Sequence, residues 1–116
     1  MKKLQFCVYV LFSFKDHKLY IGYTKDLKRR LTEHFNGNNT STKSRRPFLL
    51  IFCEYYYSQQ DAMRREEYLK TSQGKKGLKI MLKETFKELD YLAKQDDNLS
   101  FNQLSPANRV KDYEIE

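Results

Sequence analysis

The sequence predicts a small α+β domain in which a three-stranded antiparallel sheet is flanked by helices. Three observations support this fold class: two short apolar segments joined by a polar turn, a helix-periodic segment after them, and a long aromatic segment further on. The length of 116 residues fits one domain, and a hydrophobic content of 40% supplies one modest core. Nine Tyr and eight Phe suit such a sheet, because aromatic side chains bury large apolar areas.

The first two strands are expected to form a hairpin. Residues 6–13 are rich in β-branched and aromatic side chains, which is typical of a strand. Residues 15–18 are a polar turn, and residues 19–23 form the second strand. An antiparallel pair brings Tyr9 and Tyr20 near each other, although the sequence leaves the register open.

The first helix is predicted over residues 25–36, with Thr24 as its N-cap and Gly37 as a left-handed C-cap. Its apolar side chains recur at i, i+4 and i+8, which predicts a buried stripe of Leu27, Leu31 and Phe35.

The second half of the domain alternates loop, strand and helix. Residues 38–46 are a polar loop, and residues 48–57 are predicted as the central strand because they are long, apolar and aromatic. Ser58 and Asp61 resemble a capping box, and the helix after them is expected to run to about residue 70. Its expected buried residues are Ala62, Met63 and Leu69.

A last helix is predicted over residues 77–92, after a break at residues 72–74. Its helical spacing of apolar residues selects Leu78, Met81 or Leu82, Phe86, Leu89 and Leu92. The element order is therefore β-β-α-β-α-α. Residues 1–95 form the predicted domain, and residues 96–116 are expected to be a polar, flexible tail.

The charge is unevenly distributed. The chain has a net charge of +7, and residues 1–84 carry 18 Lys and Arg against 8 Asp and Glu, whereas residues 85–116 carry 4 against 7. A strongly basic domain favours a polyanionic partner such as nucleic acid. A basic protein with no such partner has the same balance, so charge alone leaves both readings open.

The cysteines and the N-terminus suggest a reducing, non-membrane setting. Cys7 and Cys53 lie in apolar runs and are interpreted as small buried hydrophobes, since neither has a Cys or His at metal-ligand spacing. Residues 4–14 faintly resemble a signal peptide, but Gln5 interrupts the run and no small-residue cleavage site follows. No run approaches the roughly 20 apolar residues of a spanning helix. We expect a cytoplasmic protein with no membrane partner.

Four side chains have a spacing suited to phosphate chemistry. Tyr9 and Tyr20 are centred on the two hairpin strands, and Arg30 and His34 share a helix face because they are separated by four residues. An arginine presents a fixed fork of donors to phosphate oxygens, and a histidine exchanges a proton near neutral pH. The alternatives are half-buried strand tyrosines and a solvated helix face.

The pattern resembles the GIY-YIG endonucleases. Val8-Tyr9-Val10 stands at the first tyrosine triplet of that family, and Tyr20-Ile21-Gly22 stands at the second. The resemblance covers residues 6–83 and is similar to the small single-domain bacterial members and to the N-terminal nuclease domain of the excinuclease C subunit. Further matching segments are Gly22-Tyr23-Thr24, Asp26-Leu27, Ser41-Thr42-Lys43, Arg45-Arg46-Pro47, Arg65-Glu66 and Leu69-Lys70.

This resemblance implies a phosphodiesterase site. Tyr20 is then the general base toward water and Tyr9 helps to position it. Arg30 clamps the phosphate, and His34 shuttles a proton or binds the phosphate. Gly22 is expected to allow close backbone approach beside the site.

The resemblance places the metal-binding Glu of the family at Glu66, four residues after Ala62 and three before Leu69. One carboxylate with several waters suits Mg²⁺, with Mn²⁺ as an alternative. Without the resemblance, Glu66 reads as a surface ion pair with Lys70.

The nucleic-acid contacts are expected from basic residues on the first helix and in the loop after it. They would bind phosphates without reading bases, and a solvated charged surface is the alternative for each of them. The predicted residues are Lys28, Arg29, Lys43, Arg45 and Arg46.

The leading hypothesis is a Mg²⁺-dependent endonuclease that cuts branched, flapped, damaged or single-stranded DNA, in DNA repair or recombination. One departure weakens it: residues 74–77 stand where many larger members carry an Asn after a Pro. The alternative is therefore a nucleic-acid-binding module of the same fold with little or no catalysis. A third hypothesis makes residues 85–116 an interaction segment for an unidentified protein partner.

Overall fold

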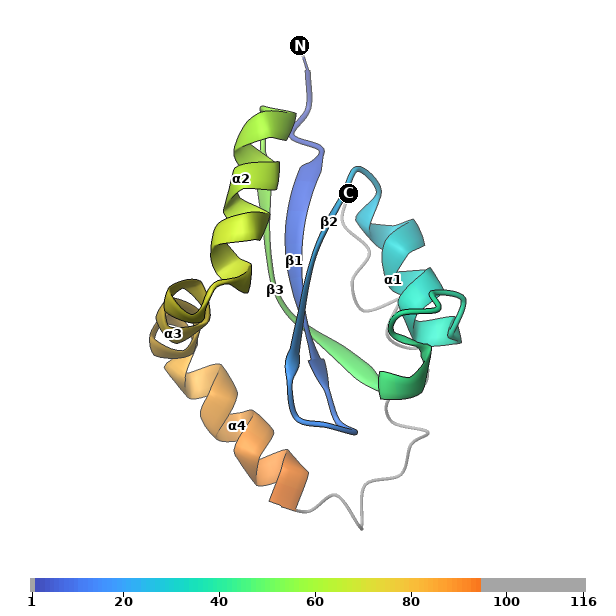
Figure 1. Cartoon of the computed structure of the whole chain (residues 1–116), viewed down its shortest axis with the longest axis vertical. Coiled ribbons are helices and arrows are strands. Elements are labelled where there is room, and N and C mark those ends of the chain that lie inside the picture. Colours follow the sequence, from blue (N-terminus) through green and yellow to red (C-terminus); the bar gives the residue numbers. More distant parts are fainter. Residues whose placement is uncertain (1, 95–116) are drawn as a thin grey trace.

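The computed structural model describes residues 2–94 and confirms an α+β fold with a three-stranded antiparallel sheet (Figure 1). The elements in chain order are β1 (Phe6–Ser13), β2 (Leu19–Thr24), α1 (Leu27–Asn36), a short 3₁₀ turn (Lys43–Arg45), β3 (Phe48–Tyr56), α2 (Gln59–Lys70), α3 (Ser72–Met81) and α4 (Lys83–Lys94).

β1 is the central strand, in the order β2-β1-β3. The prediction that residues 48–57 form the central strand is wrong, because β3 lies at an edge. Every residue of β1 is buried, whereas β3 is mostly half-buried. A strand that is covered on both faces is buried at every position, as β1 is. The continuous apolar run of β1 was therefore a better indicator of the central strand than the long aromatic run of β3.

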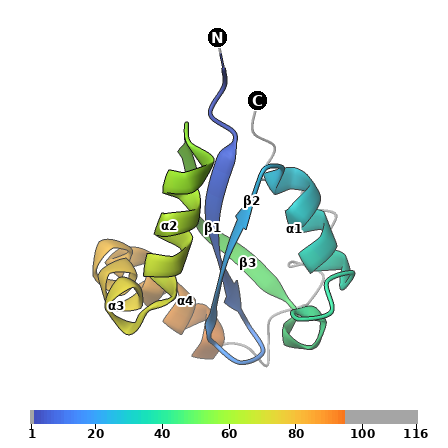
Figure 2. The same cartoon turned by 45° about the horizontal axis from the view of Figure 1, so that its top comes forward.

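The two faces of the sheet have separate cores. α1 packs its predicted stripe of Leu27, Leu31 and Phe35 against the face that carries Tyr9 and Leu11. On the opposite face, Ala62 and Leu69 of α2 and Leu78 of α3 pack against Val8, Val10 and Ile21. Figure 2 shows α1 and α2 on opposite sides of the sheet.

α1 begins two residues later than predicted, because its N-cap is Asp26 and not Thr24. The Asp26 carboxylate accepts a hydrogen bond from the backbone N–H of Arg29 at 3.2 Å. Thr24 instead ends β2, where its hydroxyl accepts from the backbone N–H of Asp26 at 3.0 Å. The predicted C-cap is confirmed, since Gly37 has a φ of 77° and its N–H bonds to the carbonyls at the end of the helix.

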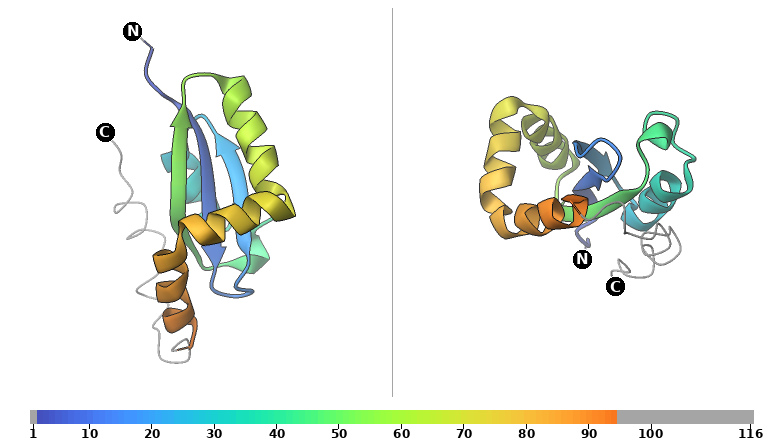
Figure 3. Two further views of the ribbon diagram at one scale, coloured as in Figure 1. Left: turned by 90° about the vertical axis from the view of Figure 1, so that its left-hand side faces the viewer. Right: turned by 90° about the horizontal axis from the view of Figure 1, so that it is seen from below.

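The predicted helix over residues 77–92 is two helices. Thr71 caps α3 by accepting a hydrogen bond from the N–H of Gly74, so the helix starts at Ser72, within the segment predicted as a break. α3 ends at Met81 with Leu82 as its C-cap, and α4 continues in a new direction (Figure 3). α2, α3 and α4 follow one another around one side of the sheet.

Several predicted core positions differ from the structure. Ser58 is the N-cap of α2 but makes no side-chain capping bond. Met63 is 42% exposed, because it lies on the outer face of α2. Of the two alternatives Met81 and Leu82, Met81 is 53% exposed and Leu82 packs against the core. Cys7 is buried and Cys53 half-buried, and both are free thiols.

The predicted tail over residues 96–116 lies outside the described residues. Within the described part of the chain, no helix has the length and apolar character to cross a bilayer.

Candidate active site

Tyr9 is the centre of the site, and the hairpin register places it opposite Gly22. The Tyr9 side chain crosses β2 at Gly22 so closely that a Cβ there would lie 2.4 Å from both Cζ and the phenol oxygen of Tyr9. A glycine is therefore required at this position by contact, as expected for close approach beside the site. Tyr9 itself is 1% exposed, so its phenol depends on partners within the protein.

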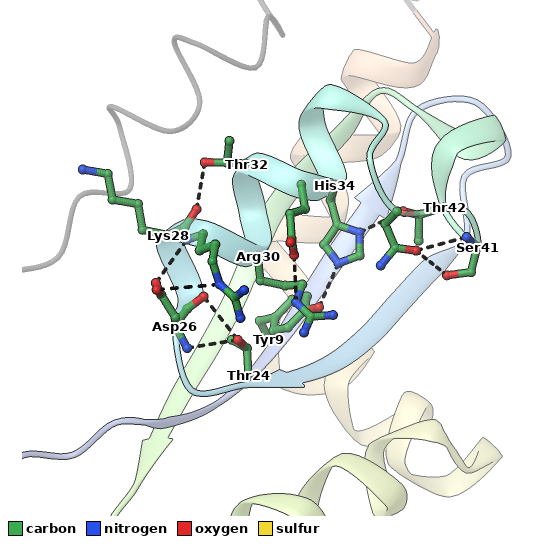
Figure 4. A network of polar contacts seen from close by, with 12 residues as sticks. Tyr9, Thr24, Asp26, Lys28, Arg30, Thr32, His34, Ser41 and Thr42 are labelled. Carbon is green, nitrogen blue, oxygen red and sulfur yellow. Dashed lines mark hydrogen bonds and ion pairs between the residues drawn. The ribbon is translucent and has the colours of Figure 1, made fainter.

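His34 and Thr42 complete a buried chain of hydrogen bonds from Tyr9 (Figure 4). The Tyr9 hydroxyl lies 2.8 Å from Nε2 of His34, and Nδ1 of His34 lies 2.8 Å from the Thr42 hydroxyl. His34 and Thr42 are fully buried. α1 contributes the histidine and the loop before β3 contributes the threonine, so this network joins three segments of the chain.

Burial, followed by the positive charge of Arg30, lowers the pKa of His34 to about 4. Burial raises the pKa of the Tyr9 phenol well above its usual range. The pair is therefore a neutral imidazole and a neutral phenol at pH 7. In one tautomer the phenol donates to Nε2 and Nδ1 donates to Thr42, and in the other both bonds are reversed.

Tyr20 and Arg30 stand next to this network. The Tyr20 ring centroid lies 5.0 Å from the His34 ring and 6.3 Å from the Tyr9 ring, and Tyr20 is half-buried. The Arg30 Nε is 3.3 Å from a carboxylate oxygen of Glu33, but the geometry is not that of a hydrogen bond. Among the described residues, this buried N–H has no hydrogen-bond partner. The Arg30 side chain is 33% exposed, so part of its guanidinium is accessible to an anion.

Glu66 is the carboxylate that acts on Tyr9 from α2. After burial and Tyr20, the negative charge of Glu66 contributes to the raised pKa of Tyr9, whereas the charge of Arg30 opposes it. The Glu66 side chain is 20% exposed and pairs with Nζ of Lys70 at 3.3 Å. The ion pair that the sequence offered as an alternative is therefore present, and the carboxylate also lies within electrostatic range of the Tyr9 phenol.

The donor set is compatible with a hydrated hard cation and not with a metal cage. In the described part of the chain, no three His, Cys, Asp or Glu side chains cluster in a metal-binding arrangement. A single carboxylate with solvent access suits Mg²⁺, which retains several of its waters. Glu66 is the residue that would hold it.

Two of the basic residues that were expected to bind DNA make contacts within the protein. Arg45 Nε bonds to Asp16 at 2.6 Å, which lowers the pKa of Asp16 to about 2. Arg46 donates to the carbonyls of Lys43 and Phe35 and packs beside Gly37. These contacts fix the loop after α1.

The other predicted phosphate contacts lie on exposed surface. Arg29 forms an exposed pair with Asp26 at 3.9 Å, and Lys28 and Lys43 are also exposed. Lys28 and Arg29 are on α1, and Lys43 is at the start of the 3₁₀ turn.

Thr42 is the site residue whose role the sequence analysis missed. It was noted only as part of a matching segment, yet its hydroxyl holds the second nitrogen of His34. A threonine in a polar loop, eight residues after a histidine, gives no periodic signal. The loop must first fold back over α1, and that return depends on the Arg45 and Arg46 contacts.

A buried tyrosine–histidine pair, a second tyrosine and a partly exposed arginine are thus brought together between β1, β2 and α1. Comparison with known proteins agrees: the family model of the GIY-YIG catalytic domain matches residues 5–79. The chain belongs to the GIY-YIG family of nuclease domains.

Relatives of similar size share this domain. The chain is 41% identical to the UPF0213 protein YazA of Bacillus subtilis over 80 residues, covering 67% of this chain and 81% of that protein. It is 40% identical to the UPF0213 protein SSP2268 of Staphylococcus saprophyticus over 68 residues, covering 58% and 83%. The solution NMR structure of the UPF0213 protein BH0048 from Bacillus halodurans is 34% identical, with a TM-score of 0.44 and coverage of 66% and 83%.

Proposed function

We propose that this chain is a divalent-metal-dependent endonuclease that hydrolyses DNA phosphodiester bonds. The observation that carries the proposal is the group of side chains around the Tyr9 phenol: His34 hydrogen-bonds to it at 2.8 Å, the Tyr20 ring lies 6.3 Å from the Tyr9 ring, and the charges of Arg30 and Glu66 both act on it. Membership of a nuclease family supports the reaction class. The basic domain supports a polyanionic substrate.

Arg30 binds the phosphate that is cut. Its guanidinium offers a planar set of donors to the non-bridging oxygens, and the negative charge that develops there strengthens those bonds. The Arg30 side chain is 33% exposed, so part of its guanidinium is open to a phosphate. Glu33, at 3.3 Å, holds the side chain in place.

Tyr20 is the half-buried phenol of the pair, whereas Tyr9 is enclosed, so Tyr20 is the one that positions the attacking water. Its phenol first gives its own proton to solvent, and the phenolate then takes a proton from the water. A bond forms between the water oxygen and phosphorus, and the bond to the leaving oxygen breaks. The leaving oxygen takes up a proton from solvent. Tyr9 holds the geometry through its hydrogen bond with His34, and the phenol and the imidazole both stay neutral during the reaction.

Glu66 would hold the divalent cation, which when bound supplies charge stabilisation for the leaving oxygen and the phosphate. Its pair with Lys70 is half-exposed and gives way readily to a cation of higher charge.

The substrate class that we propose is branched, flapped, damaged or single-stranded DNA, cut by structure and not by sequence. A site made of backbone-directed groups, with no side chains assigned to base edges, contacts what every DNA has in common. Such structures arise in DNA repair and recombination, which are the processes we propose.

The test is a cleavage assay with Mg²⁺ or Mn²⁺ on labelled single-stranded, duplex, flap and branched DNA. Glu66→Gln should slow cleavage by about 100-fold or more while DNA binding is retained. Glu67→Gln is the matched control, because Glu67 is the adjacent carboxylate and is exposed. If wild type cuts nothing and yet binds DNA with steep salt dependence, the chain is a binding module and the roles above are wrong.

A further inference from the structure

A basic groove lies between the hairpin turn and helices α3 and α4, apart from the site of Tyr9 and Arg30. It encloses about 480 Å³ and is lined by residues of the turn and its loop, and by residues of the two helices. The turn side contributes Asp16, His17, Lys18, Leu19 and Arg45, and the helix side contributes Lys75, Lys79 and Phe86. Figure 3 shows the hairpin turn between the loop after α1 and the helices α3 and α4.

The charge in this groove is positive and largely unpaired. Lys18, Lys75 and Lys79 are exposed, and none of the three has an ion-pair partner within the described residues. Lys75 and Lys79 are one helical turn apart, a like-charge spacing that destabilises a helix. The one acidic residue, Asp16, is neutralised by Arg45 at 2.6 Å. An anion bound here relieves the repulsion.

Aromatic rings form part of the groove wall. His17 stacks on Phe12 with centroids 5.9 Å apart and an interplanar angle of 11°. The turn holds His17 at a φ of 59°, in the left-handed region, with its N–H bonded to the carbonyl of Ser13 at 2.8 Å. A second hollow of about 270 Å³ shares His17, Lys79 and Phe86 with the groove and adds Phe12 and Asp90.

The groove and the proposed active site lie on opposite faces of the sheet and meet at its β2 edge. Leu19 lines the groove and packs with the core under α2 and α3, whereas the next residue, Tyr20, packs with the core under α1. β2 is an edge strand, and Leu19 and Gly22 are separated by about 10 Å along it. Arg45 also donates to the carbonyl of Leu19 at 3.3 Å, which ties the groove to the same strand. A DNA strand that passes around this edge reaches both places.

We propose that this groove binds the single-stranded DNA that flanks the phosphate to be cut. Lysines around a groove follow the phosphates while aromatic rings stack on bases, which is how single strands are bound without sequence preference. This inference rests on the proposed function, because it assigns a second part of the same substrate. It also gives the domain a physical basis for preferring flaps and single strands over uninterrupted duplex.

The test measures the binding of a fluorescently labelled single-stranded oligonucleotide in EDTA. Fluorescence anisotropy reports binding at each of a range of salt concentrations. The variant is Lys75→Gln with Lys79→Gln, and the matched control is Lys83→Gln with Lys87→Gln, two exposed α4 lysines with the same spacing. At 0.15 M salt the groove variant should bind about tenfold more weakly, and the slope of log K against log salt should fall by about 1.4. The control should stay within about twofold of wild type.

A second variant separates stacking from charge. His17→Asn tolerates the left-handed backbone and removes the ring, so binding should weaken about fivefold with the salt slope unchanged. The inference is overturned if the groove variant binds as the control does, or if it loses duplex and single-strand binding equally. Because the readout is binding, it stands apart from the nuclease assay. A wild type that cuts no DNA removes the proposed function, while a changed salt slope still supports the groove.

Discussion

The buried His34 should make folding stability depend on pH in a defined window. Its pKa is about 4 in the folded protein against an ordinary value of 6.5, because burial disfavours the imidazolium. The unfolded chain therefore binds a proton between these values that the folded chain does not. Stability from this group is fully present above the unfolded pKa and is lost as pH falls. From pH 7 to pH 5 the loss is about 2 kcal/mol.

Urea unfolding of wild type and His34→Gln at a series of pH values measures this effect. The absolute stability of the variant does not matter, because the comparison is between the pH slopes. Wild type should lose about 2 kcal/mol more than the variant between pH 7 and pH 5. Equal slopes, or an NMR titration of His34 with a midpoint near its ordinary pKa, would refute the reasoning.

Four further substitutions test contacts at the site and in the helices, each by urea unfolding. Gly22→Ala places a Cβ 2.4 Å from the Tyr9 ring and should cost about 1–3 kcal/mol; unchanged stability would mean that Tyr9 moves freely. Gly74→Ala places a Cβ 2.1 Å from the carbonyl oxygen of Tyr68 and should destabilise, whereas Gly77→Ala meets nothing within 4 Å and should stabilise by about 0.5–1 kcal/mol. The same sign for both would contradict the α2–α3 packing. Thr42→Val leaves Nδ1 of His34 unpaired and should cost about 1–3 kcal/mol, and a neutral result would count against the network.

Local patterns were sufficient to predict the elements near the site. β1 was predicted with the bounds that the structure has, and the stripe of Leu27, Leu31 and Phe35 is buried as expected. Apolar periodicity carries this information within one segment. The order of the strands does not follow from any one segment, since β3 is as apolar as a central strand and pairs along only one side.

The predicted helix boundaries were wrong where two residues compete as the N-cap, or where no residue type marks the end of the helix. Thr24 and Asp26 are both good N-caps two residues apart, and the backbone exit from β2 decides between them. The end of α3 at Met81 has no glycine or proline to mark it. Gly74 was taken for a break, but it allows α3 to pack against the backbone at Tyr68.

The sequence predicted which side chains lie near one another, but not their contacts. The spacing put Arg30 and His34 on one helix face, and the resemblance to the family placed that face near Tyr9 and Tyr20, as the structure has it. The sequence could not show that His34 is fully buried, because that depends on Tyr9 from β1 and Thr42 from the loop closing over it. The roles of these residues in catalysis remain predictions.

The most direct test of the proposed site is the single-turnover cleavage rate of Arg30→Ala at saturating DNA with Mg²⁺. Arg64→Ala is the matched control, since Arg64 is also a helix arginine paired with a carboxylate three residues away, but it is 74% exposed on α2. We predict that the rate falls by about 100-fold or more for Arg30→Ala and stays near that of wild type for the control. Equal rates for the two variants would contradict the assignment of Arg30 to the phosphate that is cut.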